Sequence, residues 1–292
     1  MIETTIRGTA AGVPFLAAPP DGDRAAAPVV LTWHLLSAPN TPESFAAAIP
    51  LAGLDAWRIH LGLPISGERL PAGGAEEVMR LGYADAVRNL QYPIPRQAAS
   101  EFPAALAALR TRFGIADDAP LGLVGGSAGA AALLLALAEG APAAAAVAIS
   151  PVVRLKDATD ATGRTFGIAY PWDAETLALV AELDFVARAG ELGDVALRIV
   201  LGSEDDAAGF HEPARALAAA RPGTDLVVVE GMGHEPVPPH ASHGSMTWTS
   251  NVLRAPSATS ASVMETRTLM SLPRRRLLRP PRRALRPPKK SS

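Results

Sequence analysis

Short apolar runs recur along the chain and are separated by alanine-rich stretches of helical character. Near-continuous apolar strands are typical of a parallel sheet that helices cover on both faces. The apolar runs cover residues 28–33, 55–64, 121–126, 145–150, 196–202 and 225–231. We expect helices near Glu43–Ala48, Arg96–Phe113, Ala128–Glu139 and Glu212–Ala220. The pattern therefore predicts an α/β fold class with a doubly wound, mostly parallel sheet.

The first twenty residues follow a different pattern. Residues 2–9 and 12–19 resemble two strands, and only a short Ala-Ala-Gly segment, residues 10–12, joins them. This connection is too short for a crossover helix, so the two strands must run antiparallel. We expect a hairpin at one edge of the sheet.

Residues 151–194 interrupt the alternation between two of the expected strands. The segment is typical of short helices that cover the carboxyl ends of the strands. Ligands bind at those ends in open α/β sheets, so the insertion is expected to form a small cap over a substrate pocket. A solvent-facing connection is the alternative. We expect one domain over residues 1–250, with the cap-like insertion inside it.

Composition narrows the possible chemistry. The chain has 292 residues, of which 48% are hydrophobic and 19% charged, as expected for one large globular domain. It has no cysteine, which excludes disulfides, thiolate metal sites and cysteine nucleophiles. The first residues lack a basic segment followed by a long apolar one, and no apolar run reaches membrane-spanning length. We expect a soluble, cytoplasmic protein without a membrane partner.

Charge is distributed unevenly along the chain. The formal net charge is −2, yet residues 254–292 hold 11 of the 27 lysines and arginines and a single acid, Glu265. Residues 254–292 therefore carry a net charge of +10, and residues 1–253 carry −12. The many prolines and arginines near the end of the sequence predict a disordered basic tail over residues 251–292. Because aromatic residues are not interleaved with the basic ones, we expect no specific nucleic-acid partner. The pattern leaves the oligomeric state unknown.

One serine stands in a motif that suits catalysis. The sequence Gly-Gly-Ser-Ala-Gly, residues 125–129, matches G-x-S-x-G and lies between an expected strand and an expected helix. A sharp turn between such elements exposes the serine and admits only small neighbours. Ser127 is therefore a candidate nucleophile, with an ordinary tight turn as the alternative.

A serine hydroxyl requires a base to accept its proton and a carboxylate to orient that base. Two further strand ends supply these groups. Asp205 and Asp206 follow the strand at 196–202, and His234 follows, on a glycine-rich loop, the strand that ends at Glu230. The chain order of serine, acid and histidine is that of the α/β-hydrolase triad. Either aspartate suits the pattern.

These motifs together resemble the α/β-hydrolase family, in its group of esterases, dienelactone hydrolases and prolyl-oligopeptidase-like enzymes. The matching segments are "GGSAG", "GSEDD" and "GMGH", and the resemblance covers about residues 1–240. It implies Ser127 as nucleophile, His234 as general base and Asp205, three residues beyond a glycine, as orienting carboxylate. Asp206 is the alternative acid.

The resemblance also implies an activity. It points to a serine hydrolase that cleaves a small-molecule carboxylic ester through an acyl-enzyme. Peptidase, thioesterase and acyltransferase activities are alternatives within the same chemistry. A catalytically inactive binding module with this fold is the alternative outside it.

An acyl-transfer site also needs donors for the developing oxyanion. The backbone N–H of Ala128 is one candidate. The family often has His-Gly after its third strand, where this chain has His34 and Leu35. We nominate the backbone N–H of Leu36 as the second donor, with that of Leu35 as the alternative. His34 itself is expected to be structural.

The remaining polar candidates suit structural roles better. His60 lies within an expected strand and should be packed and hydrogen bonded. The other histidines, His211, His240 and His243, do not follow strand ends and lack zinc-site spacing. We therefore predict neither a metal nor a cofactor. We expect Arg69 to be a surface arginine, with a role in binding an anionic substrate as the alternative.

Overall fold

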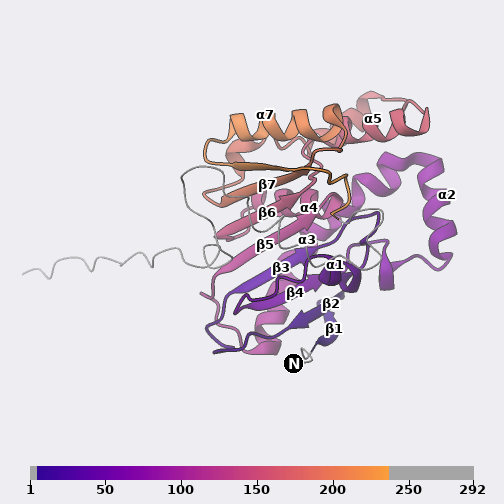
Figure 1. The fold of residues 1–292 in the computed structure, drawn as a ribbon. Coiled ribbons are helices and arrows are strands. Elements are labelled where there is room, and N and C mark those ends of the chain that lie inside the picture. Colours follow the sequence, from indigo (N-terminus) through magenta and orange to yellow (C-terminus); the bar gives the residue numbers. More distant parts are fainter. Residues whose placement is uncertain (1–4, 237–292) are drawn as a thin grey trace, which may run out of the picture.

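The computed structural model describes residues 5–236 of the chain, and its centre is a single twisted sheet (Figure 1). Within this range the sheet has eight strands in the order β1-β2-β4-β3-β5-β6-β7-β8. The expected tail at 251–292, His240 and His243 lie outside the described residues. The strands are β1 Ile6–Ala10, β2 Val13–Ala18, β3 Val29–Trp33, β4 Trp57–Leu61, β5 Leu121–Gly126, β6 Ala145–Ile149, β7 Ala196–Gly202 and β8 Asp225–Val229.

Strand directions follow the expected division of the sheet. β1 pairs antiparallel with β2, and β2 pairs antiparallel with β4, so the hairpin forms one edge as predicted. The strands β4, β3, β5, β6, β7 and β8 pair in parallel with one another. The carboxyl ends of these six strands therefore meet at one edge of the sheet.

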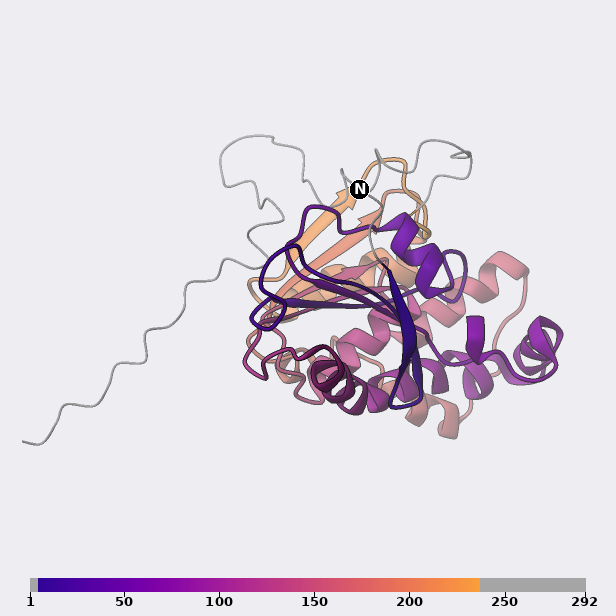
Figure 2. The ribbon, with the colours of Figure 1, turned by 90° about the horizontal axis from the view of Figure 1, so that it is seen from below.

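Helices cover both faces of the sheet, which Figure 2 shows nearly edge-on. The helix α1, Pro42–Ala48, packs on one face through Phe45. The helices α3 Pro93–Phe113, α4 Ala128–Ala138 and α7 Glu212–Ala220 cover the other face, where their apolar side chains join the larger core cluster. The doubly wound α/β prediction is confirmed.

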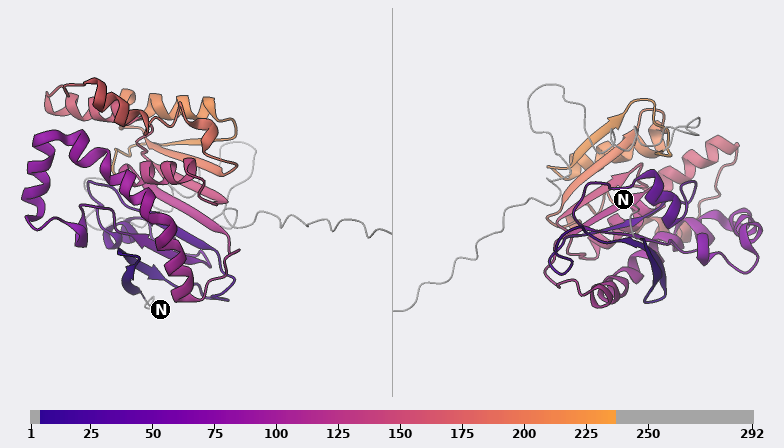
Figure 3. Two further views of the ribbon diagram at one scale, coloured as in Figure 1. Left: turned by 180° about the vertical axis from the view of Figure 1, so that it is seen from behind. Right: turned by 60° about the horizontal axis from the view of Figure 1, so that its bottom comes forward.

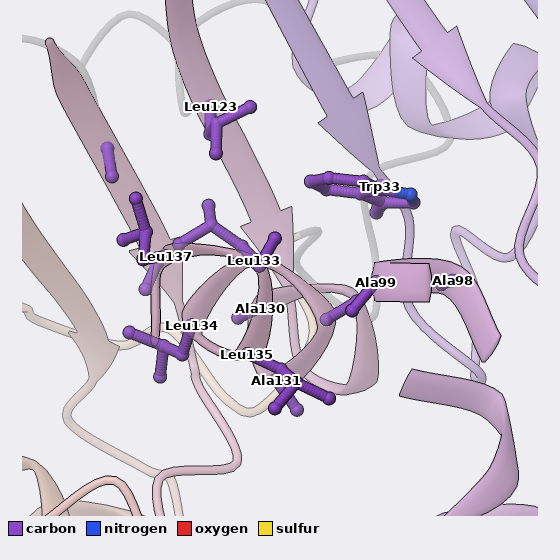
Figure 4. Close-up of a cluster of buried hydrophobic side chains, with 14 of the residues drawn as sticks. Trp33, Ala98, Ala99, Leu123, Ala130, Ala131, Leu133, Leu134, Leu135 and Leu137 are labelled. Carbon is purple, nitrogen blue, oxygen red and sulfur yellow. The ribbon is translucent and has the colours of Figure 1, made fainter. Parts of the chain in front are cut away.

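The helix α4 is the centre of the core. Its sequence is apolar on every side, and ten of its residues, Ala128–Leu137, are buried. A helix that is apolar all round needs cover from more than one direction. Figure 4 shows it packed between the sheet, represented by Trp33 and Leu123, and α3, represented by Ala98 and Ala99. The turn that begins this helix is consequently held on all sides.

The insertion at 151–194 contains two helices, as expected from its sequence. They are α5 Leu155–Phe166 and α6 Ala174–Ala181, with the short turn η3 Ala189–Glu191 after them. The short turns η1 Gly67–Arg69 and η4 Ala207–His211 complete the elements around the strand ends. Within residues 5–236, no helix has the length and apolar character that a membrane span requires.

One helical region was absent from the sequence prediction. The helix α2, Gly74–Ala86, continues through η2, Val87–Gln91, toward α3, which begins at Pro93 and not at Arg96. None of the side chains of α2 is buried, although its sequence contains the apolar residues Val78, Met79, Leu81 and Tyr83. It projects from the body of the protein beside α5 (Figures 1 and 3).

His60 lies inside the sheet, packed and hydrogen bonded as predicted. It is 4% exposed, and its Nδ1 is 2.8 Å from the hydroxyl of Thr32 on the neighbouring strand β3. Burial lowers the pKa of His60 to about 4, and the positive charge of Arg58 acts in the same direction. The folded protein therefore holds this imidazole neutral.

This shift makes stability depend on pH. The folded-state pKa of His60 lies below the ordinary value of 6.5, so protons bind the unfolded chain first as pH falls. Stability should be fully present above pH 6.5 and decrease toward pH 4, by on the order of 3 kcal/mol for this group. Urea unfolding at several pH values should show a smaller decrease for His60→Gln than for the parent. Thr32→Val, which keeps the imidazole, should retain the decrease, and an equal decrease in His60→Gln would contradict the assignment.

Candidate active site

Ser127 lies at the sharp turn between β5 and α4. Its φ and ψ angles are 49° and −113°, a conformation that residues other than glycine rarely adopt. The flanking glycines permit this turn. A Cβ at Gly125 would lie 2.4 Å from the carbonyl oxygen of Gly129, and one at Gly129 would lie 2.3 Å from the carbonyl oxygen of His34. The motif is therefore a nucleophile-elbow geometry, held by backbone that packs directly on backbone.

The turn after β7 and the loop after β8 are joined by hydrogen bonds. The N–H of Glu204 donates to the carbonyl of Met232 at 3.0 Å, and the N–H of Gly231 donates to the hydroxyl of Ser203 at 2.8 Å. A Cβ at Gly202 would lie 2.0 Å from the carbonyl oxygen of Met232. Only glycine at this position lets the histidine loop cross the end of β7.

The three side chains nominated from the sequence lie in hydrogen-bonding contact. The Oγ of Ser127 is 2.8 Å from Nε2 of His234. The Nδ1 of His234 is 3.1 Å and 3.2 Å from the two carboxylate oxygens of Asp205. With the proton on Nδ1 donated to Asp205, Nε2 presents a lone pair to the serine hydroxyl. This is the arrangement that a general base for the serine requires.

Geometry separates the two candidate acids. Asp205 is 8% exposed, and its carboxylate also accepts a hydrogen bond from the N–H of Asp206. Asp206 turns away from His234. Its carboxylate accepts from the N–H of Gly209 at 2.7 Å and pairs with Arg164 of α5 at 2.8 Å. Asp205 is therefore the aspartate that contacts the histidine, whereas Asp206 caps η4 and connects it to the inserted helix.

Two backbone N–H groups are available near the serine. Ala128 is the first residue of α4, where a helix has no internal acceptor for its N–H groups. Within residues 5–236, neither its N–H nor that of Leu36 has a hydrogen-bond acceptor. The N–H of Leu35, the alternative, donates to the carbonyl of Pro39 at 3.3 Å, and its side chain is fully buried. In the described residues, Ala128 and Leu36 therefore have N–H groups free to donate, whereas Leu35 does not.

His34 anchors the loop that carries Leu36. Its Nδ1 donates to the carbonyl of Leu35 at 2.7 Å, and its Nε2 accepts from the N–H of Leu63 at 3.0 Å. Burial lowers the pKa of His34 to about 4, against a smaller opposite effect of its backbone hydrogen bond. A neutral imidazole with both nitrogens in use is structural, as the sequence indicated.

A cavity of about 760 Å³ opens over Ser127. Its walls include the nominated groups Leu36, Ala128, Asp205 and His234. An apolar part of the remaining wall comes from α5 and its surroundings, as Val152, Leu155, Ala158 and Phe166. The insertion therefore covers the strand ends and encloses the serine. This volume is in the range of about 300–1,000 Å³ that is usual for small-molecule sites.

Other sequence candidates are separate from this cavity. His211 is buried, and its Nε2 is 2.8 Å from the carbonyl oxygen of Gly202, so it braces the end of β7. Arg69 is not the surface arginine that we expected. Its guanidinium pairs with Glu101 at 2.7 Å, with only 15% of its side chain exposed. In the part of the chain that the structure describes, no three potential metal ligands cluster.

Comparison with known proteins identifies the fold. No family model and no curated protein matches the chain. Solved structures do match. TT1662 from Thermus thermophilus is 26% identical, with a TM-score of 0.58 over 85% of this chain and 99% of its own. Est1E from Butyrivibrio proteoclasticus is 14% identical, with a TM-score of 0.57 over 85% and 95%. The chain has the α/β-hydrolase fold.

A third match is part of a larger α/β-hydrolase-fold protein. The acylaminoacyl peptidase of Pyrococcus horikoshii is 14% identical, with a TM-score of 0.55 over 84% of this chain but 39% of its own. Likeness at this level of identity describes the fold. The chemistry of the present chain has to be argued from its own side chains.

Sequence reasoning missed the apolar residues that support the triad of this α/β-hydrolase-fold chain. Phe210 packs its ring against that of His234, with 4.3 Å between the ring centroids. It also lines the cavity, as do Gln91 and Phe166 from the cap side. Each comes from a segment whose sequence has no catalytic motif, so a single sequence contains no signal for these contacts.

The crossing at Gly202 yields a direct prediction. Gly202→Ala should force the histidine loop away from β7 and destabilise the fold by about 1–3 kcal/mol, as overpacking does. The loss of the Ser127–His234 hydrogen bond should shift the ring nitrogen resonances of His234 in NMR spectra. Gly233→Ala is the matched control, because a Cβ there would meet no atom within 4 Å. If both variants unfold in urea like the parent, the crossing does not position the loop.

Proposed function

We propose that this protein is a serine hydrolase that cleaves carboxylic esters through an acyl-enzyme. The observation that carries the proposal is the chain of hydrogen bonds from Ser127 through His234 to Asp205. It lies at the carboxyl edge of the sheet, inside a cavity large enough for a small molecule. Solved structures with the same fold include a lipase and a peptidase, which is consistent with hydrolysis.

The first half of the reaction forms the acyl-enzyme. The Oγ of Ser127 attacks the ester carbonyl carbon while Nε2 of His234 accepts the hydroxyl proton. The N–H groups of Ala128 and Leu36 donate to the resulting oxyanion. The tetrahedral intermediate then breaks its bond to the alcohol oxygen, and His234 returns the proton to that oxygen. Asp205 keeps the imidazolium oriented throughout.

The second half releases the acid. A water molecule attacks the acyl carbon of the Ser127 ester, and His234 accepts a proton from that water. The intermediate expels Oγ of Ser127, which recovers its proton from His234. One water is consumed, and one acid and one alcohol are formed. No cofactor enters this balance.

Amide hydrolysis is a second candidate, which one comparison favours. The acylaminoacyl peptidase of Pyrococcus horikoshii shares the fold, although this chain covers only 39% of that protein. The same triad chemistry serves an amine leaving group, because His234 can protonate nitrogen as it does oxygen. Turnover of p-nitroanilides beside p-nitrophenyl esters distinguishes the two activities.

The nucleophile can be tested by labelling. The parent should react with a fluorophosphonate probe and hydrolyse p-nitrophenyl acetate, whereas Ser127→Ala should do neither above background. Ser37→Ala is the matched control, because Ser37 lines the same cavity without contacting His234. It should retain labelling. Equal labelling of the parent and Ser127→Ala would exclude the proposal.

The two aspartates should differ in their effect on rate. Asp205→Asn removes the charge that orients and stabilises the imidazolium, so kcat should fall on the order of 10³- to 10⁴-fold. Asp206→Asn removes an exposed ion pair but keeps an amide oxygen that can accept from the N–H of Gly209, so it should change kcat by less than about threefold. Its effect should appear in the melting temperature. A large loss of kcat in Asp206→Asn, together with an unchanged kcat in Asp205→Asn, would identify Asp206 as the acid.

A further inference from the structure

A second cavity, of about 950 Å³, lies between α2 and η2 on one side and α5 with residues 168–173 on the other. It adjoins the cavity over Ser127, because Gln91, Thr162 and Phe166 line both. The polar groups at this junction are already bonded. Thr162 donates to the carbonyl of Ala158 at 3.0 Å, and the amide oxygen of Gln91 accepts from Thr159.

Large apolar side chains are exposed along this second cavity. Met79 and Tyr83 of α2 are 58% and 86% exposed, and Phe166 and Ile168 on the opposite wall are 72% and 61% exposed. These four are among the seven large hydrophobic residues that the described part of the chain leaves exposed. Exposed apolar side chains gathered on facing walls are typical of a binding site. An apolar ligand between them would remove this surface from water.

The helix α2 lacks the packing that normally stabilises a helix. It has 13 residues and buries none of them, and its extensive contact within the described residues is with η2, which follows it. Asp85 interrupts the helical backbone with φ −167° and ψ 101°. Helices of this length are marginal in water without a packed apolar face. A ligand in the cavity would supply that contact.

The charged side chains of this cavity are paired with one another and offer no unpaired charge to an ionic ligand. They are Asp85, Arg88 and Asp173. Arg88 pairs with Asp85 at 3.1 Å and with Asp173 at 3.0 Å, and Asp85 also accepts a hydrogen bond from the hydroxyl of Tyr170 at 2.8 Å. The positive group is therefore neutralised on both sides. What remains to recognise a ligand is the apolar surface.

We propose that the cavity between α2 and α5 binds a long unbranched apolar chain of the substrate whose ester bond lies at Ser127. This inference rests on the proposed function, and it names the substrate class: esters with a medium or long hydrocarbon chain. The shared residues Gln91, Thr162 and Phe166 place the second cavity directly beside the one that holds the reacting carbonyl. Met79 and Ile168, on opposite walls, determine the preference for chain length.

Chain-length profiles of charged variants test this subsite. Met79→Glu and Ile168→Glu should each lower the ratio of kcat/KM for p-nitrophenyl octanoate to that for the acetate at least about fivefold. Both side chains are exposed, so the fold should tolerate the change. Leu177→Glu is the matched control: Leu177 is 41% exposed on α6 and lines neither cavity, and its ratio should equal that of the parent. The ratio of kcat/KM for octyl acetate to that for ethyl acetate measures the same dependence when the long chain is on the alcohol side of the ester.

Binding without turnover separates this inference from the proposed function. Octyl p-nitrophenyl ether, which has no ester bond, should quench tryptophan fluorescence saturably, and its Kd should rise at least about fivefold in Ile168→Glu. The same ether binding in a parent protein that hydrolyses no ester would contradict the proposed function and leave the subsite standing. The subsite alone would be overturned if the parent hydrolyses acetate esters and the variants match it in two respects. These are the chain-length ratios, for both the acyl and the alcohol side of the ester, and the Kd for the ether. A parent dimer that Met79→Glu converts to a monomer would also overturn it, because a second copy would then cover the cavity.

Discussion

Direct contact between backbone segments at the carboxyl edge of the sheet is the constraint on which the site depends. At Gly125 and Gly129 the turn after β5 packs on itself and on the loop after β3. At Gly202 the end of β7 lies against the loop after β8. A methyl group at any of these positions would overlap a carbonyl group. Close backbone packing at these glycines therefore positions Ser127 and His234 as much as their own hydrogen bonds do.

The parallel sheet turns these local contacts into a site. Because β5, β7 and β8 end at the same edge, residues 78 positions apart in the chain, Ser127 and Asp205, lie on opposite sides of one imidazole. The core behind them is rigid, since α4 is buried on every side. The inserted helices add walls and leave the strand ends unchanged. The proposed function therefore assigns the chemistry and the choice of substrate to different parts of the molecule.

Sequence reasoning succeeded where a residue's role follows from its immediate neighbours. Apolar runs predicted the strands, and small residues around Ser127 predicted the turn. It was incomplete where the role depends on a distant partner. Asp205 and Asp206 are adjacent and chemically equal. The resemblance to the family favoured Asp205, and their different partners in the structure, His234 for Asp205 and Arg164 for Asp206, distinguish them. Arg69 pairs with Glu101 from another helix. The helix α2 was missed: its apolar residues, Val78, Met79, Leu81 and Tyr83, alternate with glycine and charged residues, and none of its side chains packs into the core.

In the proposed mechanism, Ser127 carries the acyl group between the two halves of the reaction. Rapid quenching of the protein with p-nitrophenyl acetate, followed by mass spectrometry of its peptides, measures this directly. We expect one acetyl group on the peptide that contains Ser127, formed at the rate of the initial p-nitrophenol release and lost in His234→Ala. Turnover without an acetylated peptide, or acetylation at another residue that keeps pace with turnover, would contradict it.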